Sequence, residues 1–231
     1  WGIEPRIDRR AEYKTAPNTA TETGFTPAQR DDLQALVDDL TRQAVRDIAQ
    51  DRGLEATALR GLIDRGPFDA GQAKEAGLVD ELAYRDQALD AARAKAGGGA
   101  KLQKLQRYAA TADRPKPKGD AVALVYAVGP IMRGDGGQAS PLGGSALGAD
   151  RVAKAIEDAT ADKRVKAIVL RIDSPGGSYV ASDTIRRAVE RARAKGKPVI
   201  ASMGNAAASG GYYIALAAER IVAEPATITG S

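Results

Sequence analysis

Two glycine-rich turns hold the residues of this sequence whose types and spacing could do chemistry. The first covers residues 174–178 (SPGGS) and follows an apolar run, and the second covers residues 206–212 (AAASGGY), about one strand and one helix later. Glycine amides have no side chain in front of them, so they can approach an oxyanion closely. Ser209, inside the second turn, is therefore a candidate nucleophile for acyl transfer.

A serine nucleophile in this chain needs an unusual base. The sequence contains no His, so the imidazole that a serine hydrolase normally uses is absent. Lysine is the usual substitute. A lysine side chain with its free pKa of about 10.4 is protonated at neutral pH, so a base lysine must be desolvated or lie beside groups that disfavour the ammonium ion. A serine hydrolase of this composition should therefore hold a Ser/Lys pair in a dry cleft.

Both turns also have purely structural explanations. The 174–178 turn could need glycine only for a tight connection between a strand and a helix. Ser209 could be a packing residue or a helix N-cap, which is the commoner role of a serine in such a setting. The second turn is not the G-x-S-x-G elbow of α/β hydrolases, because position 207 is Ala.

The composition argues against several other functions. With no Cys and no His, disulfides, thiolate nucleophiles and the commonest metal ligands are missing, and we expect no metal and no cofactor. Neither the dinucleotide-binding glycine pattern nor the P-loop occurs. Lys and Arg outnumber Asp and Glu by 34 to 30, but the signs are interspersed and aromatic residues make up 4%, so nucleic-acid binding is not indicated.

The first half of the sequence predicts helices. Thr26 as N-cap and Pro27 at the first helical position begin a long amphipathic pattern that ends at Gly53. Shorter helices are expected at 54–63, 69–76 and 87–95, with a brief strand at 77–80. Residues 97–120 are rich in Lys, Gln, Pro and Gly, which is typical of an exposed connector.

The second half predicts an α/β fold. Apolar runs at 121–128, 166–172 and 199–203 are typical of strands covered on both faces, and helical patterns lie between them. A parallel sheet with flanking helices follows. Residues 134–148, rich in Gly and Ser, are expected to form a long loop. The expected domains are 1–96, mainly helical, and 121–231, joined by a linker over 97–120.

Four motifs in the second half give the chain a family resemblance. It resembles signal peptide peptidase A, of serine peptidase family S49, because four separate motifs occur in the same order as in that family. They are residues 166–178 (KAIVLRIDSPGGS), 196–199 (GKPV), 202–213 (SMGNAAASGGYY) and 227–231 (TITGS). The resemblance implies a ClpP/crotonase-like fold of ββα repeats, in which glycine turns build an oxyanion hole. In the long, two-repeat form of the family, 1–96 would end the first repeat and 121–231 would begin the second.

The resemblance also assigns roles to residues. The family takes its serine from the second repeat and its base lysine from the first, and residues 13–16 (YKTA) match the lysine motif with Thr in place of Ser. It thus implies this site: Ser209 as nucleophile, Lys14 as general base, the amides of Gly210, Gly176 and Gly177 as oxyanion donors, and Ser231 as the hydroxyl that orients the lysine. Ala11 stands where the family usually has glycine, three residues before the lysine.

The activity implied by the resemblance is that of a serine endopeptidase. Its substrates would be signal peptides or other hydrophobic, membrane-associated peptides, and the room beside Ser209 suits small or apolar side chains. The family further implies a homo-oligomer anchored in the bacterial inner membrane, with the catalytic domain on the periplasmic or extracytoplasmic side. Two alternatives stay open: a crotonase-type acyl-CoA enzyme with an Asp or Glu base, and a catalytically inactive, membrane-associated scaffold of the same fold.

The anchor itself is not in this sequence. No stretch approaches the ~20 apolar residues that span a bilayer. The sequence begins at Trp1 without Met and stops within a β-branched run, so we expect both ends to lie inside a longer protein.

Overall fold

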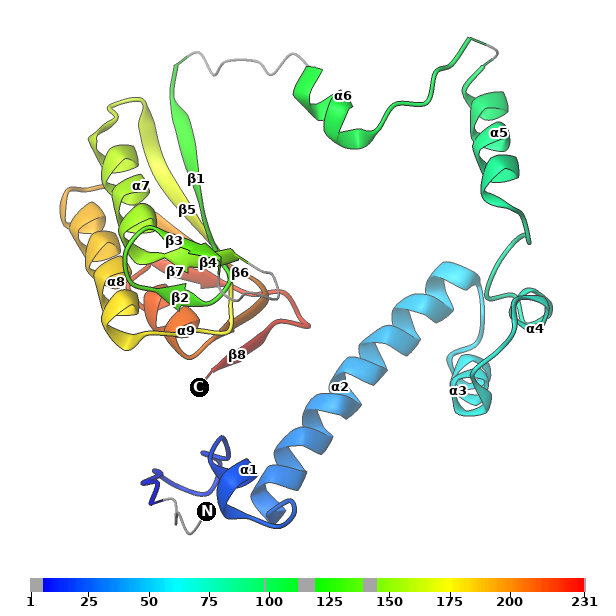
Figure 1. The fold of residues 1–231 in the computed structure, drawn as a ribbon, viewed down its shortest axis with the longest axis horizontal. Helices are drawn as coiled ribbons and strands as arrows, with labels where there is room; N and C mark the ends of the chain where they lie inside the picture. The colour runs from blue at the N-terminus through cyan, green and yellow to red at the C-terminus, as the bar shows by residue number, and fades with distance from the viewer. Residues whose placement is uncertain (1–5, 98, 112–118, 139–144, 231) are drawn as a thin grey trace. The chain divides into compact units, whose positions relative to one another are not determined.

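The chain forms two compact units. The computed structural model describes residues 6–97, 99–111, 119–138 and 145–230. Unit 1 runs through residue 115 and unit 2 begins at residue 116, and the positions of the two relative to one another are not determined (Figure 1). Among the described residues, no helix is both long enough and apolar enough to cross a membrane.

Helices make up the described secondary structure of unit 1. They are α1 (Asn18–Thr21), α2 (Pro27–Arg52), α3 (Ala56–Arg65), α4 (Ala70–Glu75), α5 (Arg85–Ala96) and α6 (Leu105–Thr111). The predicted ends of α2 are confirmed: the Thr26 hydroxyl accepts a hydrogen bond from the Gln29 amide, and Gly53 ends the helix with a φ of 62°. Helix α6 lies inside the stretch that we expected to be an irregular connector.

The predicted strand at 77–80 is wrong, because this segment ends helix α4. Gly77 has a φ of 72°, and the Leu78 amide donates to the Ala73 carbonyl at 2.9 Å, which is the pattern of a glycine C-cap. The Arg52 guanidinium then binds the Gly77 carbonyl at 2.9 Å and the Asp80 carboxylate at 2.9 Å. These contacts fix the turn against the end of α2.

The core of unit 1 is small. Val45 and Ala49 of α2 pack with Leu59 of α3, and these are the buried apolar side chains of the cluster. The apolar stripe of α2 is otherwise open within the described residues: Leu33, Leu36, Val37 and Ile48 are 38–55% exposed.

Unit 2 is built on a parallel sheet. Its strands are β1 (Ala121–Val128), β5 (Val165–Ser174), β6 (Val199–Ala208) and β7 (Arg220–Val222), in the order β1-β5-β6-β7, and β8 (Ile228–Gly230) pairs with the second half of β6. Every pairing in this sheet is parallel. Helices α7 (Ala149–Ala161), α8 (Tyr179–Ala194) and α9 (Gly210–Ala215) alternate with the strands. The predicted α/β class, a parallel sheet with flanking helices, is confirmed.

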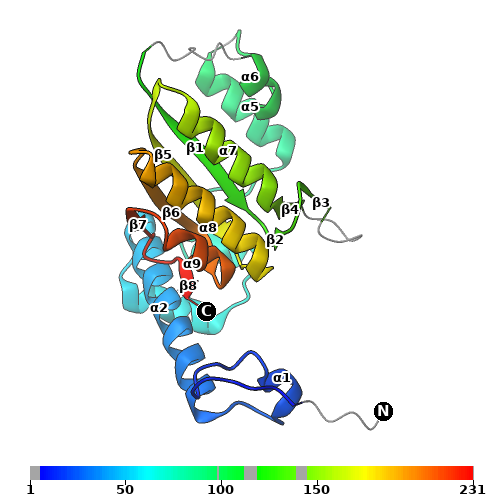
Figure 2. The same ribbon diagram turned by 90° about the vertical axis from the view of Figure 1, so that its left-hand side faces the viewer.

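All three of these helices lie on the same face of the sheet (Figures 1 and 2). Ile168, Leu170 and Ile172 of β5 are completely buried against them. On β1, however, the alternate residues Val122, Leu124, Tyr126 and Val128 are 49–62% exposed. The expectation that the apolar strands are covered on both faces is therefore wrong for β1 within the described residues, since the helices cover only one face.

The predicted loop at 134–148 is also wrong in part. It contains β3 (Gly136–Gln138) and β4 (Ser145–Gly148), which pair antiparallel in a small second sheet, with β2 (Ile131–Met132) on the other side of β4. Gly136 has a φ of 78°, and a Cβ on it would lie 2.6 Å from the Gly148 amide. Glycine thus serves close strand pairing here rather than mobility.

Candidate active site

The two glycine-rich turns meet at one edge of the sheet. Strands β5 and β6 are parallel neighbours, with Ser174 opposite Ala207, so the turns that follow them leave the sheet side by side. A Cβ on Gly176 would lie only 2.7 Å from the Ser209 Cβ and 2.7 Å from the Gly210 amide nitrogen. A side chain at position 176 would therefore collide with backbone, which explains why this turn needs glycine.

Ser209 has a strained backbone and an open side chain. Its φ of 50° and ψ of −119° are unusual for a residue with a side chain, and such outliers cluster at functional sites. Its amide donates to the Gly230 carbonyl of β8 at 2.6 Å, which holds the turn. The side chain is exposed and makes no cap hydrogen bond to α9. Neither structural alternative, N-cap or packing residue, accounts for this hydroxyl.

The Gly176 amide is engaged within its own turn. It donates to the Ser174 hydroxyl at 3.1 Å, and that hydroxyl donates to the Gly129 carbonyl at 2.7 Å. Ser174 is completely buried, so this pair of hydrogen bonds satisfies its hydroxyl and fixes the end of β5. Of the two glycines in the turn, Gly177 is the one whose amide is left for a ligand.

The Gly177 amide lies close to Gly210. Gly177 sits opposite Ile131, which bonds to the residues on either side, so the Gly177 amide points away from that partner. Its nitrogen lies 3.4 Å from the position of a Cβ on Gly210. Within the part of the chain that the structure describes, neither amide donates to a protein acceptor. Two such donors beside a serine hydroxyl are the arrangement that stabilises an oxyanion.

A cleft of about 260 Å³ opens beside Ser209. It is lined by Gly177, Tyr179, Ser209, Gly210, Tyr212, Tyr213 and Leu216, all from unit 2. Hydrogen bonds with the Tyr179 hydroxyl and with the Asp183 carboxylate raise the pKa of Tyr213 to about 12. The Tyr213 phenol is therefore neutral over the whole range in which a lysine base would titrate.

Lys14 lies in unit 1. Its side chain is exposed there, and its backbone amide donates to the Ala11 carbonyl at 3.4 Å, closing a turn. Ala11 has a φ of 61°, so it occupies a conformation that favours glycine, the residue usual in the family at this position. Lys14 and Ser209 thus belong to units whose relative positions are not determined. Ser231 lies outside the described residues.

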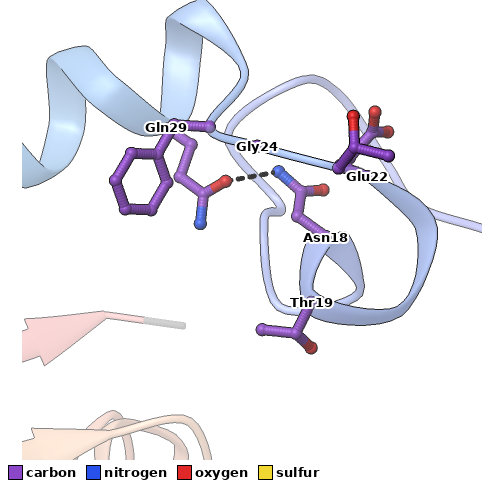
Figure 3. A pocket seen from close by; sticks show the side chains of 7 residues that line it. Asn18, Thr19, Glu22, Gly24 and Gln29 are labelled. Carbon is purple, nitrogen blue, oxygen red and sulfur yellow. Dashed lines mark hydrogen bonds between the residues drawn. The ribbon is translucent and has the colours of Figure 1, made fainter.

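A buried asparagine anchors the segment that carries Lys14. Asn18 is 3% exposed. Its side-chain oxygen accepts from Arg9 at 2.8 Å, and its side-chain nitrogen donates to Gln29 of α2 at 2.9 Å. Figure 3 shows the Asn18 and Gln29 side chains directed toward one another in a pocket of about 250 Å³. These hydrogen bonds join the two ends of the 9–18 segment, which contains Lys14, and connect the segment to α2.

Replacing Asn18 with Leu should loosen this loop. The change leaves Arg9 and Gln29 without their shared partner and should cost roughly 1–3 kcal/mol in the local free energy of opening. Hydrogen exchange of the 9–29 backbone amides in the full-length protein measures it. Asn18→Asp, which keeps an acceptor for Arg9, and Thr19→Ala, at an exposed neighbour, are the controls. Unchanged protection in Asn18→Leu would contradict the anchoring role.

Sequence reasoning found the two turns but missed several supporting residues. Asn18 and Asp183 carry no motif that marks them, and the place of Tyr213 in the 202–213 motif does not reveal its partner. The contacts join residues 11 and 30 positions apart in sequence. Among the described residues, no group of three or more His, Cys, Asp or Glu side chains is placed to hold a metal ion.

These features define a class: an α/β protein with a strained, exposed serine at a strand-to-helix turn and two glycine amides close to it. The chain belongs to peptidase family S49, whose family model matches residues 1–98 and 191–231, more than half of the sequence. The match covers both Lys14 and Ser209.

Curated relatives carry protease names. The chain is 34% identical to "Serine protease SPPA, chloroplastic" of Arabidopsis thaliana, an alignment that covers 100% of this chain and 35% of the relative. It is 34% identical to "Protease 4" of Salmonella typhi over 99% of this chain and 38% of the relative. The chain therefore spans little more than a third of the length of these relatives.

Solved structures are similar over smaller parts of the chain. A mutant of ClpP1 from Listeria monocytogenes is 26% identical, with a TM-score of 0.31, over 42% of this chain and 46% of that one. A mutant of the 1510-N membrane-bound stomatin-specific protease is 24% identical, with a TM-score of 0.35, over 46% of this chain and 45% of that one.

Proposed function

We propose that this chain carries the nucleophile and the general base of a serine endopeptidase, with Ser209 and Lys14 as a catalytic dyad. The observation that carries the proposal is the strained backbone of Ser209, with a φ of 50°, at a residue that lines the cleft, is exposed and makes no cap hydrogen bond. Membership of peptidase family S49 supports the same chemistry. Lys14 as base and Ser231 as its orienting hydroxyl come from the family resemblance.

The reaction would follow the usual order of acyl transfer. The neutral amine of Lys14 accepts the proton of Ser209 Oγ while that oxygen attacks the carbonyl carbon of the scissile bond. The resulting oxyanion accepts hydrogen bonds from the Gly177 and Gly210 amides, each worth on the order of 10²–10³ in rate. The Lys14 ammonium then protonates the leaving amine of the substrate. The neutral Lys14 amine that results activates a water molecule, which hydrolyses the acyl-enzyme.

The proposed role of the 174–178 turn is divided between its two glycines. Gly177 is the oxyanion donor, because its amide has no acceptor among the described residues. Gly176 supports the turn instead, because its amide is engaged by Ser174 and its lack of a Cβ lets Ser209 approach. Our expectation of three amide donors thus becomes a proposal of two.

The proposed substrates are extended, apolar peptides. The cleft beside Ser209 is walled by Tyr179, Tyr212 and Leu216, which suits hydrophobic side chains such as those of signal peptides. We further propose, from the family resemblance, a homo-oligomer at the bacterial inner membrane, with the site on the periplasmic or extracytoplasmic side. The crotonase-type alternative needs an Asp or Glu base, and the described residues that line this cleft include no carboxylate.

Labelling with a fluorophosphonate tests the proposal. We expect the full-length protein to form one covalent adduct, located on Ser209 by mass spectrometry of its peptides. Ser209→Ala should remove the adduct, whereas Ser202→Ala, which removes another β6 hydroxyl, should keep it. An unlabelled wild-type protein, or an adduct on another residue, would overturn the proposed mechanism and favour a scaffold.

A further inference from the structure

Tyr213 links the two helices that begin at the candidate site. It lies in the first turn of α9, where its backbone amide donates to the Ser209 carbonyl at 2.9 Å. Its phenol donates to Asp183 Oδ1 at 2.9 Å, and Asp183 belongs to α8. A single residue therefore connects Ser209, through its backbone, to the helix that follows the Gly177 turn.

The phenol and its acceptor are both held by neighbours. The rings of Tyr213 and Tyr179 lie 5.3 Å apart between centroids, and the Arg186 guanidinium carbon lies 5.3 Å from the Tyr213 centroid. Arg186 also lies 3.4 Å from Asp183 and pairs with Glu190 at 2.7 Å. The Asp183 carboxylate thus accepts a charge-assisted hydrogen bond from the phenol, with Arg186 beside both groups.

This network is better suited to positioning than to global stability. The Asp183 side chain is 50% exposed and that of Arg186 is 32% exposed, and ion pairs at such sites contribute little to the free energy of unfolding. Catalytic geometry is far more sensitive, because a displacement of about 1 Å can cost on the order of 10²-fold in rate. A contact that fixes the start of α9 would therefore show its effect in the rate.

We propose that Tyr213, held by Asp183, is a positioning residue that fixes Ser209 and the Gly210 amide relative to the Gly177 amide. The proposal rests on the proposed function. The close packing of Gly176 against Ser209 sets how near the two turns come, and the contact between Tyr213 and Asp183 sets the orientation of α9 at that distance. The oxyanion donors then stand ready before substrate arrives, without reorganisation during the reaction.

A double-mutant cycle in the full-length protein tests the proposal. Tyr213→Phe removes only the hydroxyl, and Asp183→Ala removes its acceptor together with the Asp183 contact to Arg186. Tyr126→Phe makes the same chemical change as Tyr213→Phe on the open face of β1 and is the matched control. The rate constant for Ser209 modification by a small fluorophosphonate, kcat and KM for a peptide substrate, and the melting temperature are measured for each variant.

Each of the two single changes should lower the modification rate and kcat on the order of tenfold, while KM and the melting temperature stay near the wild-type values. The double variant should lose no more rate than either single variant, because both changes remove the same hydrogen bond between Tyr213 and Asp183. Asp183→Asn, which keeps an acceptor oxygen, should recover most of the rate.

Wild-type rates in Tyr213→Phe, losses that multiply in the double variant, or a raised KM alone would overturn the positioning role. If Ser209→Ala still abolishes labelling in those cases, the proposed function survives. Absence of wild-type labelling overturns both.

Discussion

Ser209→Ala is expected to lower peptide hydrolysis by the full-length protein on the order of 10⁴-fold or more. The loss would be that large because, in the proposed mechanism, the hydroxyl oxygen forms the bond to the substrate, and Ser209 carries the one aliphatic hydroxyl among the described residues that line the cleft. Turnover of a chromogenic peptide ester and a peptide amide measures the effect. The fold should be retained, because alanine keeps the Cβ and the amide that bonds to Gly230.

Two further variants make this result specific. Ser202→Ala should leave turnover unchanged, since Ser202, on β6, accepts a hydrogen bond from Arg171 of β5 and does not line the cleft. Ser209→Gly should be as inactive as Ser209→Ala but somewhat more stable, because glycine adopts a φ of 50° without strain. Retained turnover in Ser209→Ala would remove Ser209 from the mechanism, and a less stable glycine variant would show that the conformation is not strained.

Lys14→Arg should cause the second large loss, on the order of 10²–10⁴-fold in kcat. Arginine keeps the positive charge and nearly the length of lysine, but its guanidinium does not deprotonate in proteins and so cannot accept the Ser209 proton. Steady-state kinetics on the full-length protein measure the loss. Lys104→Arg, at an exposed lysine of unit 1, is the matched control and should match the wild type.

The outcome for Lys14→Arg separates base catalysis from a purely electrostatic role. A variant that keeps wild-type kcat would mean that a fixed positive charge suffices and that another group accepts the proton. Circular dichroism and hydrogen exchange of residues 9–29 check that the Asn18 anchor is intact in the variant, so a loss of rate is not a loss of local structure.

The sequence predicted those parts of the fold that depend on local patterns. The Thr26 cap, the Gly53 stop and the alternation of apolar strands with helices all arise from neighbouring residues, and the structure confirms them. The meeting of the two turns also follows from order alone, because parallel neighbouring strands end at the same edge. The family resemblance, rather than this order, is what assigned Ser209 and Gly177 to one site.

The remaining features depend on contacts that no local pattern encodes. The engaged amide of Gly176 needs the buried Ser174 hydroxyl, and the contact between Tyr213 and Asp183 joins two helices. The open face of β1 could not be predicted, because an apolar run does not tell which side the helices will cover. The same limit applies to α2, whose apolar stripe is largely exposed within unit 1.

The pH dependence of Ser209 modification is the most direct test of the proposed role of Lys14 as the general base for Ser209. The fluorophosphonate rate is measured between about pH 6 and pH 10 for the wild-type protein and for Lys14→Met, which keeps a long side chain without an amine. Tyr213 does not interfere, since its pKa is raised to about 12. We expect the wild-type rate to rise with pH, because catalysis by a general base needs the base in its unprotonated form, and the variant rate to be low and flat. Equal rates and equal slopes in the two proteins would contradict the Ser/Lys dyad.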